Sequence, residues 1–281
     1  MSPSPELTDQ ERQMALVRDR FTRTAKVFAD YVLTERVFEA ERLLRLVAPD
    51  GTERALDVAC GPATLARIFA PHVRWIGGLD LTPAMLERAR REAAERSLAN
   101  FCAIRGNVLQ MPFRDDSFDI VVTSYSIHHL PDAAAALHEI ARILKRGGKF
   151  GMLDMIVSED AAAAKMCNDI EIARDSSHTR ALPASEFERL LASVGLHIVQ
   201  REIIEHPRAF EQWMRTAGWK RGDAEYEATR KLLEASIPDD SASLRPKFLE
   251  PPEQRGANAF PDGRPDIELV HAALYLSAEK Q

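Results

Sequence analysis

The chain has too few cysteines to build a disulfide framework. Its 281 residues include only Cys60, Cys102 and Cys167, and their spacing does not match that of metal ligands. Lone cysteines of this kind are typical of a reducing compartment. We therefore expect a cytoplasmic protein with no disulfide and no bound metal.

Long apolar runs and an excess of positive charge are also missing. No stretch reaches the roughly 18 consecutive apolar residues that a membrane-spanning helix needs. Residues 1–6 lack the charged and then apolar pattern of a signal peptide. The net charge of −6 is not the basic footprint of a nucleic-acid-binding protein. We expect neither membrane insertion nor a nucleic-acid partner, and the oligomeric state stays open.

What the sequence does contain is a sharp strand–turn–helix signal. The apolar run 55–59 predicts a buried strand, Gly61 breaks it, and a helical pattern follows from Thr64 to Ala70. Pro62 fits the first turn of that helix. Such a turn directs free backbone N–H groups and the positive helix end at one point, which suits a carboxylate or a phosphate. The turn lacks the three glycines of the dinucleotide fingerprint.

A second signal follows 19 residues after Gly61. The apolar run Val73–Leu79 predicts a strand that ends in Asp80, and Thr82 with Pro83 predicts a capped helix start. An acidic residue at such a strand tip, about 20 residues after the glycine turn, can accept the hydroxyls of a ribose. A solvated turn acid is the simpler alternative, but the flanking elements favour ribose binding.

The alternation of strands and helices continues beyond this point. Further strands are predicted at 101–105, 118–124 and 150–156, and a helix capped by Asp132 is predicted to end at Gly147 and Gly148. Five strands alternating with helices predict an α/β fold with a doubly wound, mostly parallel sheet. Ligands of such folds bind beyond the carboxyl ends of the strands. Five polar residues fall at or near those ends: Asp57, Asp80, Asn107, Ser124 and Asp154.

Helical patterns also precede the first strand and follow the fifth. Residues 9–47 predict two or more helices, and 185–192 a helix with Glu188 in a capping box. Residues 197–205 predict a sixth strand, and 267–276 a last strand at the sheet edge. We expect an N-terminal helical lid at 1–50 and a core at 51–281. Within the core we expect a lid insertion at about 158–194 and a helical and loop excursion at about 207–265.

Together these motifs resemble a class I S-adenosylmethionine-dependent methyltransferase. The resemblance is closest to the small-molecule group that includes the ubiquinone/menaquinone-biosynthesis-type enzymes, and it covers about residues 20–220. The matching segments are Leu56–Ala63, Gly78–Leu86, Gly106–Phe113, Ser117–Asp119, His128–Asp132 and Leu144–Gly148, with Arg174–His178 similar to a lid signature. The resemblance implies a Rossmann-like sheet of seven strands with an N-terminal helical lid.

The resemblance also implies S-adenosyl-L-methionine as the cofactor and assigns its contacts. The backbone of Ala59, Cys60 and Gly61 would face the methionine part, with Asp57 nearby, and Asp80 would hold the ribose. Leu81 would pack on adenine, Asn107 and Val108 would meet its edge, and Ser124 would lie beside the amino-acid end. Alanine can replace glycine in the turn if the φ angles are negative. Asn107 replaces the usual acid, and its amide oxygen can still accept from the adenine amino group.

Catalysis on this scaffold requires an acceptor held in line with the methyl group. His128 and His129 follow the fourth strand and Asp154 ends the fifth, so an Asp–His pair can deprotonate a hydroxyl acceptor. Adjacent histidines on an extended loop point apart, so only one is expected to face the substrate. A pair of structural loop histidines is the alternative.

The expected lid supplies the substrate contacts, namely Tyr31, Arg174 and His178, with Phe21, Phe28 and Met166 as further apolar walls. For Arg174 and His178, a surface salt-bridge cluster is the alternative. The function predicted is O-methylation of a small-molecule hydroxyl. C- or N-methylation of a small metabolite stays open, as does a non-methylating protein that binds the cofactor. A nicotinamide-dependent dehydrogenase is disfavoured because the glycine spacing is absent.

Overall fold

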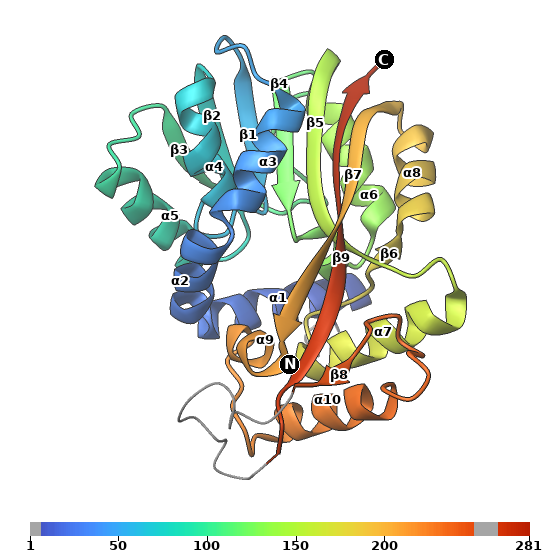
Figure 1. The fold of residues 1–281 in the computed structure, drawn as a ribbon. Coiled ribbons are helices and arrows are strands. Elements are labelled where there is room, and N and C mark those ends of the chain that lie inside the picture. Colours follow the sequence, from blue (N-terminus) through green and yellow to red (C-terminus); the bar gives the residue numbers. More distant parts are fainter. Residues whose placement is uncertain (1–6, 250–263) are drawn as a thin grey trace, which may run out of the picture.

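The computed structural model describes residues 7–249 and 264–281, which fold around one central sheet (Figure 1). Its strands are β1 (Arg54–Val58), β2 (Trp75–Asp80), β3 (Phe101–Arg105), β4 (Phe118–Ser124), β5 (Leu144–Val157), β6 (Leu182–Pro183), β7 (Leu196–Ala209), β8 (Lys247–Phe248) and β9 (Ile267–Lys280). The strand order is β3-β2-β1-β4-β5-β9-β7, with β6 paired to β5 and β8 to β9. The first six strands pair in parallel, whereas β9 runs antiparallel to both β5 and β7. The predicted mostly parallel α/β sheet is confirmed, with β6 and β8 as short additions to the seven expected strands.

Helices cover both faces of this sheet. They are α1 (Asp9–Arg23), α2 (Ala25–Glu35), α3 (Val37–Val47), α4 (Thr64–Phe69), α5 (Pro83–Glu95), α6 (Ala133–Ile143), α7 (Ala161–Arg174), α8 (Ala184–Ser193), α9 (Phe210–Thr216) and α10 (Ala224–Ala235), with short 3₁₀ turns η1 (Ala70–His72) and η2 (Ile127–His129). Leu137 and Ile140 of α6 and Phe187 of α8 pack on one face, and Leu43 of α3 with Phe69 of α4 packs on the other. Burial of these apolar side chains is the main term that holds helices and sheet together. None of the described helices is long and apolar enough to cross a membrane.

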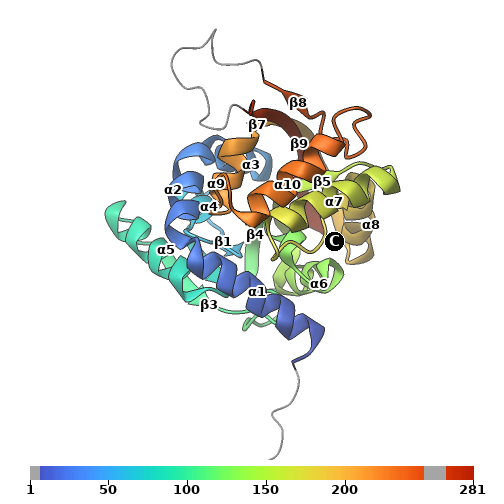
Figure 2. The same cartoon turned by 90° about the horizontal axis from the view of Figure 1, so that it is seen from below.

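A further group of helices lies at one end of the sheet. In Figures 1 and 2, α1, α2, α7, α9 and α10 gather beneath the carboxyl ends of the parallel strands. Phe210, Trp213 and Tyr226 from this group share an apolar cluster with Met155 of β5 and Leu269 of β9. These helices therefore cover the edge of the sheet at which ligands of such folds bind.

The last strand does not lie at the sheet edge as its sequence pattern predicts. Strand β9 lies between β5 and β7, and Leu274 and Leu276 are fully buried in the core. The edge strand of this side is β7, where Val199 is 60% exposed and Ile203 51% exposed. The alternation of apolar residues along β9 indicates a strand, but it does not indicate which distant strands pair with it on its two sides.

The predicted end of the helix that Asp132 caps is also wrong. Helix α6 ends at Ile143, and Gly147 and Gly148 lie inside β5. They lie in a bulge, because the pairing moves from Leu144 opposite Phe118 to Lys149 opposite Ile120. Gly147 has a φ of 72°, which suits glycine in such a bulge.

The predicted capping box of α8 does not form. The helix begins at Ala184 without a side-chain cap. The backbone N–H and the hydroxyl of Ser185 both donate to the Glu159 carboxylate instead. A partner from a distant loop has thus replaced the local one that the sequence pattern suggested.

Candidate active site

A cavity of about 170 Å³ opens at the carboxyl ends of the parallel strands. The turns after β1, β2 and β4 form one side of it, and α1, α2, α9 and the ends of β7 and β9 form the other. From the predicted set, Ala59, Cys60, Gly61, Asp80, Leu81, Val108, Ser124, Tyr31, His128, His129, Arg174 and His178 line it. Residues distant in the sequence thus meet in one cleft that is both polar and apolar, as small-molecule sites commonly are.

The turn after β1 takes a left-handed backbone at three positions. The φ angles are 55° at Ala59, 52° at Gly61 and 70° at Ala63. The condition under which alanine replaces glycine freely, a negative φ angle, is therefore not met, and each alanine holds a conformation that costs about 1–2 kcal/mol for a residue with a Cβ. Pro62 precedes the helix and does not occupy its first turn, because Ala63 is the residue that caps α4. The chain keeps this strained path, which turns the N–H of Gly61 toward Asp80.

Asp80 joins the tips of β1 and β2. One carboxylate oxygen accepts from the Gly61 N–H at 2.9 Å, and the other accepts from the Thr82 N–H at 2.7 Å. Burial raises the pKa of Asp80 above its usual value, although these N–H donors oppose the shift. Thr82 lies at the cap position of α5 as predicted, but its side chain makes no capping hydrogen bond.

Asp57 and Asn107 do not line the cavity. Asp57 is 1% exposed and accepts from the Ala66 N–H at 3.0 Å, so it holds the start of α4 in place. Burial raises its pKa well above the usual range. The side-chain oxygen of Asn107 accepts from the Leu109 N–H within its own turn. Both residues shape the loops that line the cleft.

The space in front of Gly61 is large enough to be considered for the adenosyl cofactor that the sequence leads us to expect. A Cβ built on Gly61 would meet no atom within 4 Å, although Gly61 lines the cavity. The neighbouring Asp80 carboxylate can accept from hydroxyl groups, and Leu81 and Val108 offer apolar contacts beside it. An open cradle next to a hydroxyl acceptor and apolar walls fits the adenosine part of S-adenosylmethionine.

The two histidines and Asp154 come together as an ordered group. Asp154 is fully buried and lies 2.5 Å from Nδ1 of His128, and it also accepts from the N–H groups of Ser126, Ile127 and Met155. The His128 ring therefore donates from Nδ1, which leaves Nε2 as a proton acceptor. Asp154 does not line the cavity, but it orients the ring that does.

His129 lies beside His128 and does not point away from it. The two residues belong to the 3₁₀ turn η2, and their ring centroids are 4.3 Å apart, so the expectation of diverging side chains on an extended loop is wrong. Nδ1 of His129 donates to the Ser177 carbonyl at 3.0 Å. Burial, together with the neighbouring His128, lowers the pKa of His129 well below its usual value. His129 is therefore neutral near pH 7 and a weaker base than an unperturbed histidine.

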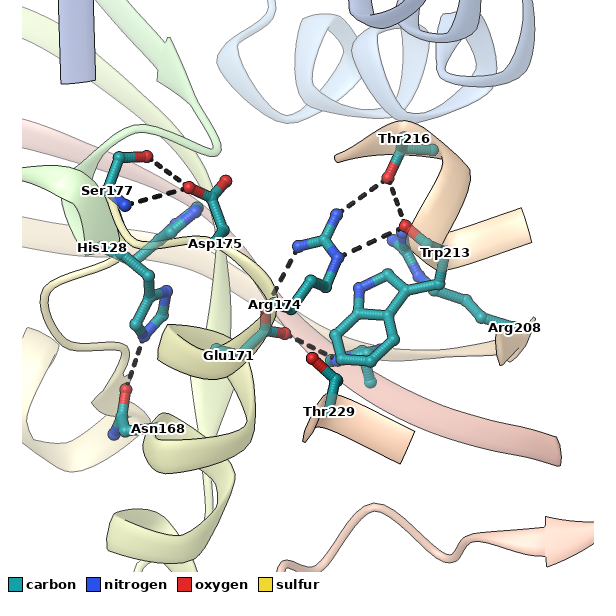
Figure 3. Close-up of polar contacts among 12 residues, drawn as sticks. His128, Asn168, Glu171, Arg174, Asp175, Ser177, Arg208, Trp213, Thr216 and Thr229 are labelled. Carbon is teal, nitrogen blue, oxygen red and sulfur yellow. Dashed lines mark hydrogen bonds and ion pairs between the residues drawn. The ribbon is translucent and has the colours of Figure 1, made fainter. Parts of the chain in front are cut away.

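Arg174 and His178 belong to a largely buried polar network and not to a surface cluster, and Figure 3 shows the part of this network around Arg174. Arg174 pairs with Glu171 at 3.2 Å and donates to Thr216 at 2.8 Å, and its guanidinium lies 4.6 Å from the Trp213 ring centroid. His178 donates from Nε2 to Asn168 at 2.7 Å, since that amide oxygen also accepts from a backbone N–H. Burial lowers the pKa of His178 to about 4.

Sequence reasoning missed several side chains of the cavity and misplaced one. The missed residues are Arg20, Arg36, Glu39, Tyr125, Asp175, His206, Arg208, Trp213 and His271. Met166 packs in the apolar cluster behind the cavity and does not line it, whereas Phe21 and Phe28 line it as expected. The alternation of His206 and Arg208 along β7 was a usable signal, because residues two apart share one face of a strand.

Comparison with known proteins identifies the family of this chain. A model of the family described as "Methyltransferase domain" matches residues 56–152, which hold the turns after β1, β2 and β4. The "uncharacterized methyltransferase YcgJ" of Bacillus subtilis is 31% identical over 202 residues, covering 70% of this chain and 78% of YcgJ. The chain belongs to the class I S-adenosylmethionine-dependent methyltransferase family. The residues of this methyltransferase that the family model matches include His128 and His129 and end just before Asp154.

Two further relatives refine this picture of the methyltransferase. A methyltransferase crystal structure from Bacillus halodurans superposes with a TM-score of 0.75 at 26% identity, and covers 86% of this chain and 98% of that one. The demethylmenaquinone methyltransferase of Geobacillus sp. is 37% identical over 105 residues, which is 36% of this chain and 45% of that enzyme. The second likeness is thus confined to less than half of either protein.

Proposed function

We propose that this methyltransferase transfers a methyl group from S-adenosylmethionine to the hydroxyl oxygen of a small molecule. The observation that carries the proposal is His128 in the wall of the cavity, with the buried Asp154 carboxylate held against its ring. The likeness to a demethylmenaquinone methyltransferase supports a small-molecule acceptor for the related part of this chain. C- or N-methylation on the same scaffold is the competing possibility, because one fold serves many acceptors.

The turn residues would hold the cofactor. The sulfonium of S-adenosylmethionine supplies an electrophilic methyl group. Asp80 would accept the ribose hydroxyls, the backbone at Ala59–Gly61 would face the methionine part, and Ser124 would lie beside the amino-acid end. Leu81 and Val108 would contact the base. The cradle at Gly61 supports this arrangement because it leaves room next to these groups.

His128 would act as the general base. With its Nδ1 proton donated to Asp154, its Nε2 can take the proton of an acceptor hydroxyl as the oxygen attacks. Asp154 stabilises the imidazolium that results, since the carboxylate lies 2.5 Å from the ring. A fixed acceptor geometry adds to this, because positioning alone can supply about 7–11 kcal/mol in favourable cases. Helices α1 and α2 would exclude water from the closed cleft.

The first experiment tests the cofactor. Calorimetric titration should detect binding of S-adenosylmethionine and S-adenosylhomocysteine and no binding of NAD. Binding of NAD alone would overturn the proposed function.

The second experiment tests the base with matched histidine variants. His128→Ala should lower turnover on a hydroxyl acceptor by roughly 10²–10⁴-fold with little change in cofactor affinity. His129→Ala should have a smaller effect, because Nδ1 of His129 donates to a backbone carbonyl and not to a carboxylate that could stabilise an imidazolium. Full turnover in the double variant would exclude base catalysis and leave a carbon or amine acceptor as the better assignment.

A further inference from the structure

A group of polar side chains forms the end of the cavity away from His128. We name it the Arg208 cluster, and its members are Tyr31, Arg36, Glu39, His206 and Arg208, all of which line the cavity. In Figure 3, Arg208 lies on the other side of Arg174 from His128. His206 and Arg208 project from the same face of β7, toward α2 and α3. The cavity therefore has a basic end that is separate from the histidine pair.

The arginine charges along the cavity are paired with carboxylates, except that of Arg208. Arg20 contacts Asp175 at 2.6 Å, and Arg174 contacts Glu171 at 3.2 Å. Arg36 lies 3.6 Å from Glu39. Within residues 7–249 and 264–281, no carboxylate lies within ion-pair distance of Arg208. One arginine charge at this end is therefore left without a counter-charge.

Arg208 and Tyr31 form a ready-made pair of donors. The Arg208 guanidinium donates to the Tyr31 hydroxyl at 3.4 Å, and its buried Nε has no hydrogen-bond partner. Because the Tyr31 oxygen accepts this hydrogen bond, its own hydrogen is available to another acceptor. Arginine stays charged at any physiological pH, so the group cannot relieve its burial by losing a proton. A bound anion would satisfy both donors.

The histidine of this cluster lies among charges of both signs. Burial lowers the pKa of His206, Glu39 at 3.8 Å from its Nδ1 opposes that shift, and Arg208 and Arg36 each add a smaller lowering effect. Glu39 does not cancel the charge of Arg208, because it accepts from the Tyr125 hydroxyl at 3.2 Å and lies nearest to Arg36. Among the described ion pairs, Arg208 is therefore the arginine of this cluster that keeps its positive charge without a carboxylate partner.

We propose that Arg208, together with Tyr31, binds a carboxylate of the methyl acceptor while the acceptor hydroxyl lies at His128. The inference rests on the proposed function and narrows its substrate class to small, partly apolar hydroxy acids. A guanidinium presents two parallel N–H donors, which match the two oxygens of a carboxylate. Leu153, Met155 and Trp213 line the cavity and provide apolar contacts for the body of such a molecule. Arg174 has its own partners, so it does not take this role.

The test compares an acid with its neutral counterpart. The full chain, saturated with S-adenosylhomocysteine, is titrated calorimetrically with 4-hydroxyphenylacetate and with 4-hydroxyphenylacetamide. The wild-type protein should bind the acid at least tenfold more tightly than the amide. Arg208→Gln should abolish that preference, Arg208→Lys should retain part of it, and Tyr31→Phe should reduce it several-fold.

A matched control comes from the same strand. Arg201 lies on β7 but pairs with Glu188 outside the cavity, so Arg201→Gln should keep the preference for the acid. Equal affinity for acid and amide, no binding of either probe while S-adenosylhomocysteine binds, or an undiminished preference in Arg208→Gln would overturn the inference. If S-adenosylhomocysteine itself does not bind, the proposed function fails, and the inference falls with it.

Discussion

At the scale of single residues, the turn after β1 combines an unfavourable backbone conformation with an open space at Gly61. Ala59, Gly61 and Ala63 all have positive φ angles, which are unfavourable for the two alanines. The same path directs the Gly61 N–H at Asp80 and opens the cradle beside it. Local strain at such a turn is consistent with a binding role.

Gly61→Ala should therefore affect ligand binding more than stability. The left-handed φ costs about 1–2 kcal/mol in the free energy of unfolding, and the new methyl group meets no protein atom within 4 Å. Since that methyl group would enter the cofactor space, affinity for S-adenosylhomocysteine should fall at least tenfold. Calorimetry and urea unfolding measure the two effects.

Gly195→Ala is the matched control for that variant. Gly195 has a φ of 77°, its Cβ would also meet no atom within 4 Å, and it lies after α8 at a distance from the cavity lining. It should lose similar stability and keep its affinity. Equal affinity losses in the two variants would mean that Gly61 has no direct role in binding.

Residues at the tips of parallel strands could be found from the sequence. Asp80 and the His128–Asp154 pair follow predicted strands, and the tips of parallel strands converge by the topology of the fold. Arg208 and His271 could not be found in this way. They lie on β7 and β9, and the position of β9 inside the sheet depends on pairing between segments about 70 residues apart. The φ angle of a residue such as Ala63 also depends on how the folded chain packs around it, and residue type alone does not indicate it.

At the scale of secondary-structure elements, α1 is fastened across the segment that follows α7. Gln13 donates to the Ser177 carbonyl at 2.7 Å, and Arg20 contacts Asp175 at 2.6 Å. The side chains of this ion pair are only 7% and 3% exposed. These contacts support a lid, and we propose that residues 7–50, the described part of the expected N-terminal lid, act in it together with residues 158–194.

Breaking this ion pair should loosen the lid and weaken the fold. Arg20→Met leaves the Asp175 carboxylate buried without its partner, which should cost about 3–5 kcal/mol in the free energy of unfolding. Arg20→Met with Asp175→Asn should cost clearly less than the sum of the single changes, because no unpaired charge is then buried. Urea unfolding measures the stabilities, and limited proteolysis of α1 measures the opening.

Arg12→Met provides a control on the same helix. Arg12 pairs with Asp9 at the surface, with both side chains more than half exposed, so its loss should stay within about 0.5 kcal/mol. Saturating S-adenosylhomocysteine should slow cleavage of α1 in the wild-type chain. Cleavage that ignores both the ligand and the Arg20 variant would count against a lid.

At the scale of the whole molecule, burial of the active-site cleft makes the fold sensitive to acid. The pKa values of His129, His178, His206 and His271 are all lowered, in each case chiefly by burial. The unfolded chain therefore binds more protons than the folded chain once the pH falls below about 6.5, and stability declines with falling pH. Asp57 and Asp80, whose pKa values burial raises, act in the opposite direction.

A single variant isolates the contribution of one histidine to this pH dependence of stability. The pKa of His178 falls from 6.5 to about 4 on folding, so its share of stability is present above pH 6.5 and is lost as the pH drops toward 4. Between pH 7 and pH 5 that share is about 2 kcal/mol by proton linkage. In His178→Gln, whose amide can still donate to Asn168, the loss of unfolding free energy over this interval should be smaller than in the wild type by that amount. Urea unfolding at the two pH values measures it, with the exposed His72→Gln as a control that should follow the wild type. Identical pH dependence in His178→Gln and the wild type would show that His178 does not bind protons differently in the folded and unfolded states.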